Sequence, residues 1–199
     1  TPTPAAQNKI IEFISVPEPV PEPEPEPPAP EPPAPEVPSL AVVVNEIAWS
    51  GTKADSSDEW LELYNNTTST VDLASWILSW SHGTTTHSLT FSTSSILANG
   101  FYLLERTASD TTDAAEDQIY TGALNNDGEK LELRDAGNNL IDLVDFSAGW
   151  PAGTSSPNYI SMERINSTSS ATSTNWASNN LLTRNGLDAL GNKINGTPL

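Results

Sequence analysis

The sequence predicts an all-β fold, either a sandwich or a barrel, from about residue 40 to residue 176. Short runs rich in β-branched, aromatic and leucine residues follow one another there, and Gly, Asn and Asp turn signals separate them. Several runs alternate apolar and polar residues with a period of two. No long segment has the period of an amphipathic helix, and residues 111–118 are the only ones that could form a helical turn.

Seven strands are expected in order, at 41–49, 59–65, 70–81, 85–91, 100–106, 129–135 and 139–146. The alternation is clear where Trp76, Leu78 and Trp80 recur at every second position. An Asn-Gly pair precedes the fifth strand, and Asn-Asp-Gly precedes the sixth. The Asp-Ala-Gly-Asn turn at 135–138 is expected to join the last two strands as a hairpin.

Three regions are predicted: an acidic Pro-rich stalk or linker at 1–39, a β-sandwich domain at 40–178, and a C-terminal extension at 179–199. Fourteen of the 17 prolines precede residue 39. Proline fixes φ and removes a donor, so the first region is expected to be disordered or extended rather than part of a core. It would act as a passive spacer or as a ligand for a Pro-binding groove. The last region would add an edge strand or continue as a linker.

Composition excludes several classes of function. The formal net charge is −18, of which residues 1–40 contribute −6 and the remaining residues −12. A field of this sign repels phosphate, so no direct nucleic-acid binding is expected. The absence of cysteine excludes disulfides, thiolate metal sites and cysteine catalysis. No apolar run approaches the roughly 20 residues of a membrane helix, so no membrane-spanning segment is expected in this chain.

Eight motifs in a fixed order give the fold a more specific identity. They are 45–47 (Asn-Glu-Ile), 58–65 (Asp-Glu-Trp-Leu-Glu-Leu-Tyr-Asn), 71–76 (Val-Asp-Leu-Ala-Ser-Trp), 124–133 (Leu-Asn-Asn-Asp-Gly-Glu-Lys-Leu-Glu-Leu), Gly137 with Ile141-Asp142, Trp150-Pro151, 161–164 (Ser-Met-Glu-Arg) and Asn175-Trp176. Together they resemble the lamin tail domain family, over residues 41–177. The resemblance implies an immunoglobulin-like β-sandwich of lamin-tail type.

The same resemblance implies a function without catalysis. The coiled-coil rod of a nuclear lamin is replaced here by the Pro/Glu-rich segment, so bacterial relatives are the closer comparison. We therefore expect an interaction or architectural module of an exported bacterial protein, located outside the cell or at its surface, with a protein or a surface glycan as partner. The alternatives are a carbohydrate- or calcium-dependent adhesion module, and an accessory domain of a hydrolase or nuclease that lies outside this chain.

Large aromatic side chains are the first structural candidates. Trp60, Trp76, Trp80 and Trp150 are expected to pack between or beside the sheets, because a large ring fills a sandwich core well. Trp176, in the late Asn-Trp motif, is given the same structural role. The alternative is that one or two tryptophans are exposed and stack on sugar rings.

Carboxylates are the second group of candidates. Asp110, Asp113, Glu116 and Asp117 could supply oxygens to Ca²⁺, although their spacing is not that of a dedicated calcium loop and a solvated acidic loop is the alternative. Asp55 and Asp58 form a second, weaker candidate.

Glu46 is expected to be structural. It has the same parity as the apolar Val42 and Val44, so its side chain should point inward, where a buried carboxylate needs a partner. Arg164 is a candidate partner.

Catalytic motifs are absent from the sequence, and neither a catalytic residue nor a cofactor is expected. His82 and His87 would face opposite sides if the segment between them were extended, which is unfavourable for a shared metal ion. The protein is therefore not expected to be an enzyme.

Overall fold

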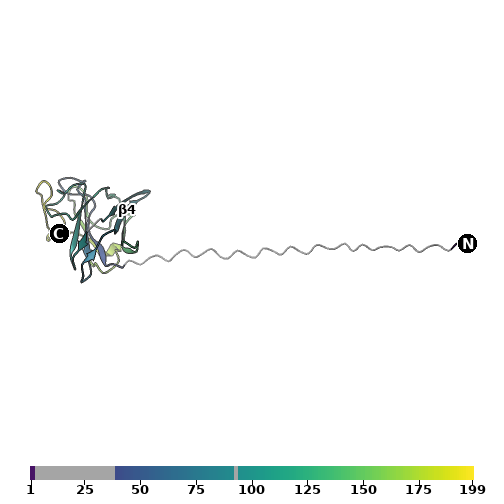
Figure 1. Cartoon of the computed structure of the whole chain (residues 1–199). Coiled ribbons are helices and arrows are strands. Elements are labelled where there is room, and N and C mark those ends of the chain that lie inside the picture. Colours follow the sequence, from purple (N-terminus) through teal and green to yellow (C-terminus); the bar gives the residue numbers. More distant parts are fainter. Residues whose placement is uncertain (3–38, 92–93) are drawn as a thin grey trace. The chain divides into compact units, whose positions relative to one another are not determined.

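Strands dominate the described residues from 39 onward (Figure 1). The computed structural model describes residues 1–2, 39–91 and 94–199, so the Pro-rich segment predicted for 1–39 lies almost entirely outside the described residues. Within the described residues there are twelve strands and one short 3-10 turn, η1 (Ser173–Asn175), and no helix is long and apolar enough to cross a membrane. The predicted all-β fold is confirmed.

Two sheets form the sandwich, and a small third sheet lies beside them. The six-stranded sheet has the order β12 (Trp176–Ser178), β11 (Met162–Arg164), β1 (Val42–Ala48), β2 (Trp60–Asn65), β7 (Phe101–Arg106) and β8 (Gln118–Tyr120). The four-stranded sheet has the order β10 (Leu140–Asp145), β9 (Lys130–Arg134), β4 (Ile77–His82) and β5 (Thr85–Thr90). The third consists of β3 (Val71–Asp72) and β6 (Ser95–Ile96).

Each of the seven expected strands has a counterpart, and the differences have local causes. The strand expected at 70–81 is divided, because Ser75 has a positive φ of 64° and turns the chain between β3 and β4. The helical turn considered for 111–118 is not formed: residues 111–114 and 117 are bends, and Gln118 begins β8. There the carboxylate of Glu105 accepts the backbone N–H groups of Thr111 and Thr112, which holds the loop in a non-helical path.

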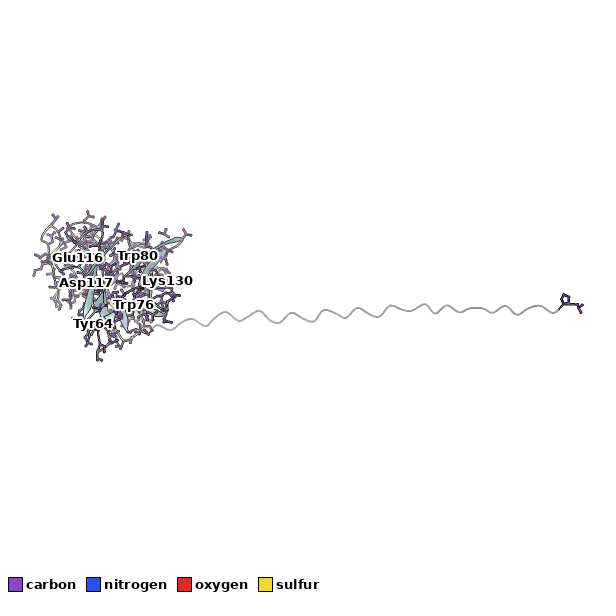
Figure 2. The ribbon with its side chains drawn as sticks, in the orientation of Figure 1. Tyr64, Trp76, Trp80, Glu116, Asp117 and Lys130 are labelled. Carbon is purple, nitrogen blue, oxygen red and sulfur yellow. The ribbon has the colours of Figure 1, made fainter. Side chains whose placement is uncertain are left out.

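The main core lies between the two large sheets. Leu61 and Leu63 of β2 face Leu78 and Trp80 of β4 within one apolar cluster, and all four side chains are buried. Trp80 packs edge-on against Tyr120, at a ring distance of 5.4 Å. Figure 2 shows Trp76 and Trp80 between Tyr64 on one side of the domain and Lys130 on the other.

A β-bulge in β1 changes which face each side chain occupies. Val44 is paired with Leu63 of β2, and Glu46 is paired with the adjacent Glu62. Asn45 is therefore an extra residue in the ladder. Val44 therefore points into the main core, whereas Glu46 is buried on the outer face of the six-stranded sheet. The expectation that Glu46 has the orientation of Val42 and Val44 is wrong, because a bulge reverses parity.

The partner predicted for Glu46 is also wrong. Arg164 instead makes a two-pronged ion pair with Asp142 of β10, with Nη1 to Oδ2 at 2.7 Å and Nη2 to Oδ1 at 3.1 Å. Both side chains are buried, and the ring of Trp176 covers the guanidinium at 5.8 Å. Because Arg164 lies on β11 and Asp142 on β10, the pair connects the two sheets.

We expect Trp60→Ala and Trp76→Ala each to lower the free energy of unfolding by about 3–5 kcal/mol, because each replacement leaves a cavity where a large ring was buried. Urea denaturation measures the change. Leu182→Ala is the control, since Leu182 is 91% exposed and its removal should have little effect. Equal stability of the two tryptophan variants and the control would contradict the assigned packing.

Candidate functional site

The outer face of the six-stranded sheet carries a row of carboxylates. Glu46 on β1 is directly paired with Glu62 on β2 and with Glu163 on β11. We call these three residues the carboxylate row. Glu46 and Glu62 are buried, and Glu163 is half-buried. Three acids in adjacent positions would repel one another in ionised form, so each needs a proton or a donor.

The C-terminal segment supplies many of those donors. Thr197 donates its backbone N–H to Oε1 of Glu46 at 2.9 Å and its hydroxyl to Oε2 at 2.6 Å. The backbone N–H of Leu199 donates to Glu62 at 3.0 Å. Asn179 donates its side-chain amide to Glu163. The segment expected to be an edge strand or a linker therefore covers the outer face of the sheet.

Gly196 explains how closely this segment approaches. A side chain at this position would place its Cβ 2.7 Å from Oε1 of Glu46 and 2.7 Å from the ring of Trp60. A small second core forms beside it, from Ala48, Trp60, Leu103 and Ile194. Trp60 is thus buried beneath the C-terminal segment, on the outer side of the sheet.

Two members of the carboxylate row, Glu46 and Glu62, are weaker acids than ordinary glutamates. Burial raises the pKa of Glu46 to about 7, and hydrogen bonds from Ser161 and Thr197 oppose that rise. Burial also raises the pKa of Glu62 to about 8, and the neighbouring Glu46 adds to the rise. The row acts as a set of acceptors that hold the cover in place, and nothing in its geometry resembles a catalytic pair aimed at an open pocket.

The other end of the same outer face is open. A shallow groove of about 270 Å³ lies there. We call it the aromatic groove, and its lining residues are Asn45, Tyr64, Phe101, Arg164, Ile165 and Ser167. Tyr64 and Phe101 pack against each other at 4.9 Å with a 41° tilt. Phe101 is 36% exposed and Ile165 is 65% exposed, so the groove presents two apolar side chains to solvent among polar groups.

Sequence reasoning did not single out this groove. Tyr64 lies four residues after Trp60 in β2, so the two side chains share the outer face, but nothing in the sequence showed that one end of that face would be covered and the other open. The partner ring, Phe101, comes from β7 and reaches Tyr64 only through the strand register. The signal available was an aromatic residue at an outward-facing position on each of two strands.

The four acids proposed for calcium are not brought together. Oδ1 of Asp113 accepts the backbone N–H of Leu187 at 2.6 Å, and Oδ2 of Asp117 accepts that of Leu103 at 2.8 Å. The part of the chain that the structure describes contains no group of three or more His, Asp or Glu side chains placed to hold a metal ion. Asp110 and Glu116 remain loop side chains; Figure 2 shows Glu116 beside Asp117.

The tryptophan side chains pack within the domain, as expected for a structural role. Trp60, Trp76 and Trp176 are buried, and Trp150 is half-buried and stacked on Trp49 with ring centres 6.1 Å apart. The indole N–H of Trp150 donates to the carbonyl of Asn125 at 2.8 Å. These positions give no exposed tryptophan for stacking on a sugar.

His82 and His87 lie on the same face of the β4–β5 hairpin. His87 is opposite Trp80, and His82 is two residues further along the same strand as Trp80. Opposite faces were expected only if the segment between the two histidines were extended. The segment is not extended, because the chain turns at Gly83 with a φ of +59°.

Comparison with known proteins adds a family. The family model described as Lamin Tail Domain matches residues 36–148. A search of curated proteins found no match. The matched region includes β1 to β10, and it ends before Arg164 and before the C-terminal cover.

We expect stability to fall as pH rises from about 5 to about 8. In the unfolded chain both Glu46 and Glu62 have ordinary pKa values near 4.5, so folding takes up protons at these groups, and the stabilisation is lost as pH rises through their folded values of about 7 and 8. Urea midpoints across this range measure the slope. Glu62→Gln should flatten it, whereas the control Glu116→Gln, in a loop, should not. Stability that rises with pH would contradict the arrangement.

We expect millimolar calcium to leave the melting temperature unchanged relative to sodium at the same ionic strength, because Asp113 and Asp117 already accept backbone N–H groups. Differential scanning calorimetry measures this. A rise that disappears when both residues are changed to Asn would instead show that the loop binds calcium, since a ligand of the folded state alone raises its stability.

Proposed function

The chain belongs to the lamin tail domain family, a family of immunoglobulin-like interaction modules, and we propose that it binds a partner protein, without catalysis, through the aromatic groove. The observation that carries the proposal is the accessible aromatic pair at the open end of a sheet face that the C-terminal segment covers elsewhere. Protein interfaces are enriched in aromatic residues and depleted in acidic ones. The groove lining contains Tyr64 and Phe101 and no carboxylate, although the chain has 26 acidic residues.

A rigid base supports this use of the groove. Asn45 is held in the bulge and donates its side-chain amide to Glu62 at 2.9 Å. Arg164, which also lines the groove, is fixed by Asp142. Binding to such a surface costs little ordering entropy, because the side chains around it are already held.

The location of the protein is part of the proposal. We propose an exported bacterial protein that acts outside the cell or at its surface, where a Pro/Glu-rich segment before the domain would serve as a spacer. The support is the composition of that segment and the resemblance to modules of bacterial surface proteins. Protease treatment of intact source cells, followed by detection with an antibody to the domain, would test the location.

A glycan is the second candidate partner. Tyr64 and Phe101 offer ring faces, and Asn45 and Ser167 offer polar groups beside them. Because the two rings are tilted by 41°, a flat sugar ring cannot stack across both, whereas a protein side chain can pack against the surface they form together.

The test compares three forms of the immobilised domain: the native protein, the double variant Tyr64→Ala/Phe101→Ala, and Leu182→Ala as a control at an exposed position elsewhere. Each is exposed to solubilised envelope proteins of the source cells and, separately, to a glycan array. We expect a protein bound by the native and control forms and lost from the double variant by roughly thirtyfold, the effect of removing a hot spot of about 2 kcal/mol.

Melting curves must show that the double variant is folded. Equal capture by all three forms, or no captured protein at all, would contradict the assignment. Glycan binding that requires Tyr64 and Phe101 would show that the groove binds a glycan, the second candidate partner.

A further inference from the structure

Strand β5 forms an open edge on the other sheet. It is the last strand of the four-stranded sheet and pairs only with β4 in the described residues. The two strands are joined by the two-residue turn at Gly83 and Thr84, with His82 opposite Thr85. In such a hairpin the closing pair exchanges both hydrogen bonds, and the pattern then alternates. Thr86, Ser88 and Thr90 therefore direct their backbone N–H and C=O groups away from β4.

The other sheet ends are occupied or short. On β10, the carbonyl of Ile141 accepts the N–H of Leu40 at 2.8 Å, and Asp142 is held by Arg164. The edge strands β8 and β12 have three residues each. Strand β5 has six residues, four of them exposed, and no hydrogen bond within the described part of the chain reaches its outward side.

This edge lacks the usual protection. Natural proteins guard exposed edge strands with charged residues, proline or bulges. Residues 73–104, which contain β4 and β5, include no Asp, Glu, Lys, Arg or Pro, in a chain with 34 charged residues of those kinds. The β4–β5 pairing is regular along all six residues, without a bulge. An edge left in this state is suited to pairing with another strand.

A pocket of about 250 Å³ opens beside the inward-facing side chains of β5. Its lining includes Thr85 and His87 of β5, His82 of β4, and Asn125 and Glu129 from the loop before β9. Oε2 of Glu129 accepts the N–H of Asn125 at 2.6 Å, while no donor in the described residues reaches Oε1. Glu129 as a whole is only 2% exposed. Nδ1 of His82 is engaged by the carbonyl of Gly128 at 2.8 Å.

We propose that β5 accepts an extended segment of a basic partner protein as a fifth strand, with a lysine or arginine side chain of that segment entering the pocket to meet Glu129. Backbone hydrogen bonds along an edge give affinity, and a pocket for an alternate side chain gives specificity. A residue paired with His87 places its side chain on the pocket side of the sheet. A cation there would meet the free oxygen of a buried carboxylate, in a protein whose net charge of −18 attracts a basic partner.

A second copy of the chain is a poorer occupant. Pairing two β5 edges would place Thr85 or His87 of the other copy, not a cation, near Glu129. Two molecules that each carry −18 repel one another, and six residues of edge bury little area for a stable dimer. This surface is also separate from the aromatic groove, which lies on the outer face of the other sheet, so either can fail without the other.

The test uses a displayed library of random nine-residue peptides, selected on the native domain. We expect enriched peptides with alternating β-branched residues and one Lys or Arg at a fixed position. Ser88→Pro removes an outward N–H at an edge position that tolerates proline, and Thr86→Lys places a charge on the edge; each should weaken the selected peptides by at least roughly tenfold, a loss of about one good hydrogen bond. Ser81→Lys is the matched control on the neighbouring strand, and should bind normally.

Glu129→Gln tests the pocket, because an amide can still accept the N–H of Asn125 but carries no charge. Peptides with Lys or Arg should lose their advantage over the same peptides with norleucine in that variant. Failure to enrich any peptide, or selected peptides that bind Ser88→Pro and Thr86→Lys as well as the native domain, would overturn the proposal. If analytical ultracentrifugation showed that the native protein is a dimer and that Ser88→Pro is a monomer, the β5 edge would instead bind a second copy of the chain.

Discussion

The buried ion pair between Arg164 and Asp142 determines how the rest of the domain is built. A bulge leaves backbone groups without hydrogen-bond partners in the ladder, and here the ion pair supplies those partners. Asp142 accepts the backbone N–H of Val44 at 2.9 Å, and Arg164 donates to the backbone carbonyl of Val44 at 3.1 Å. The bulge at Asn45 is thereby fixed, and β1 can place valines in the sandwich core and a glutamate on the opposite face. A buried pair of this kind contributes less to net stability than to a unique arrangement, because desolvation offsets much of its attraction.

The division of the outer sheet face follows from that arrangement. Beyond the bulge, the carboxylate row and Trp60 require a cover, which the chain from Asn179 to Leu199 provides. Before the bulge, Tyr64 and Phe101 remain accessible. The family match ends at residue 148, so the donors that satisfy Glu46 and Glu62 come largely from outside the matched region. The matched strands form the sandwich, and the residues after them decide which part of its surface is open.

Sequence reasoning succeeded where the determinants are local. The hairpin between β9 and β10 is specified by Asp135, whose side chain accepts the N–H groups of Gly137 and Asn139. It failed where two distant segments decide the outcome. The outward orientation of Glu46 depends on a bulge that Asp142 of β10 holds in place. The arrangement of the strands pairs Arg164 with Asp142 instead of with Glu46, the partner considered from the sequence. The aromatic groove and the pocket beside β5 are likewise products of strand pairing, which no single stretch of sequence reveals.

The position of β1 has a consequence for biosynthesis. Its neighbour β2 follows soon after it in the chain, but its other neighbour, β11, is made far later, since Glu46 pairs with Glu163. At a synthesis rate of roughly 5–20 residues per second, β1 waits on the order of 10 s for β11, with one edge unpaired and its valines without a complete core. Contacts so distant in sequence also slow folding after release. The sandwich is therefore complete only once its C-terminal strands have been made, and until then β1 is an exposed edge that can pair with other chains.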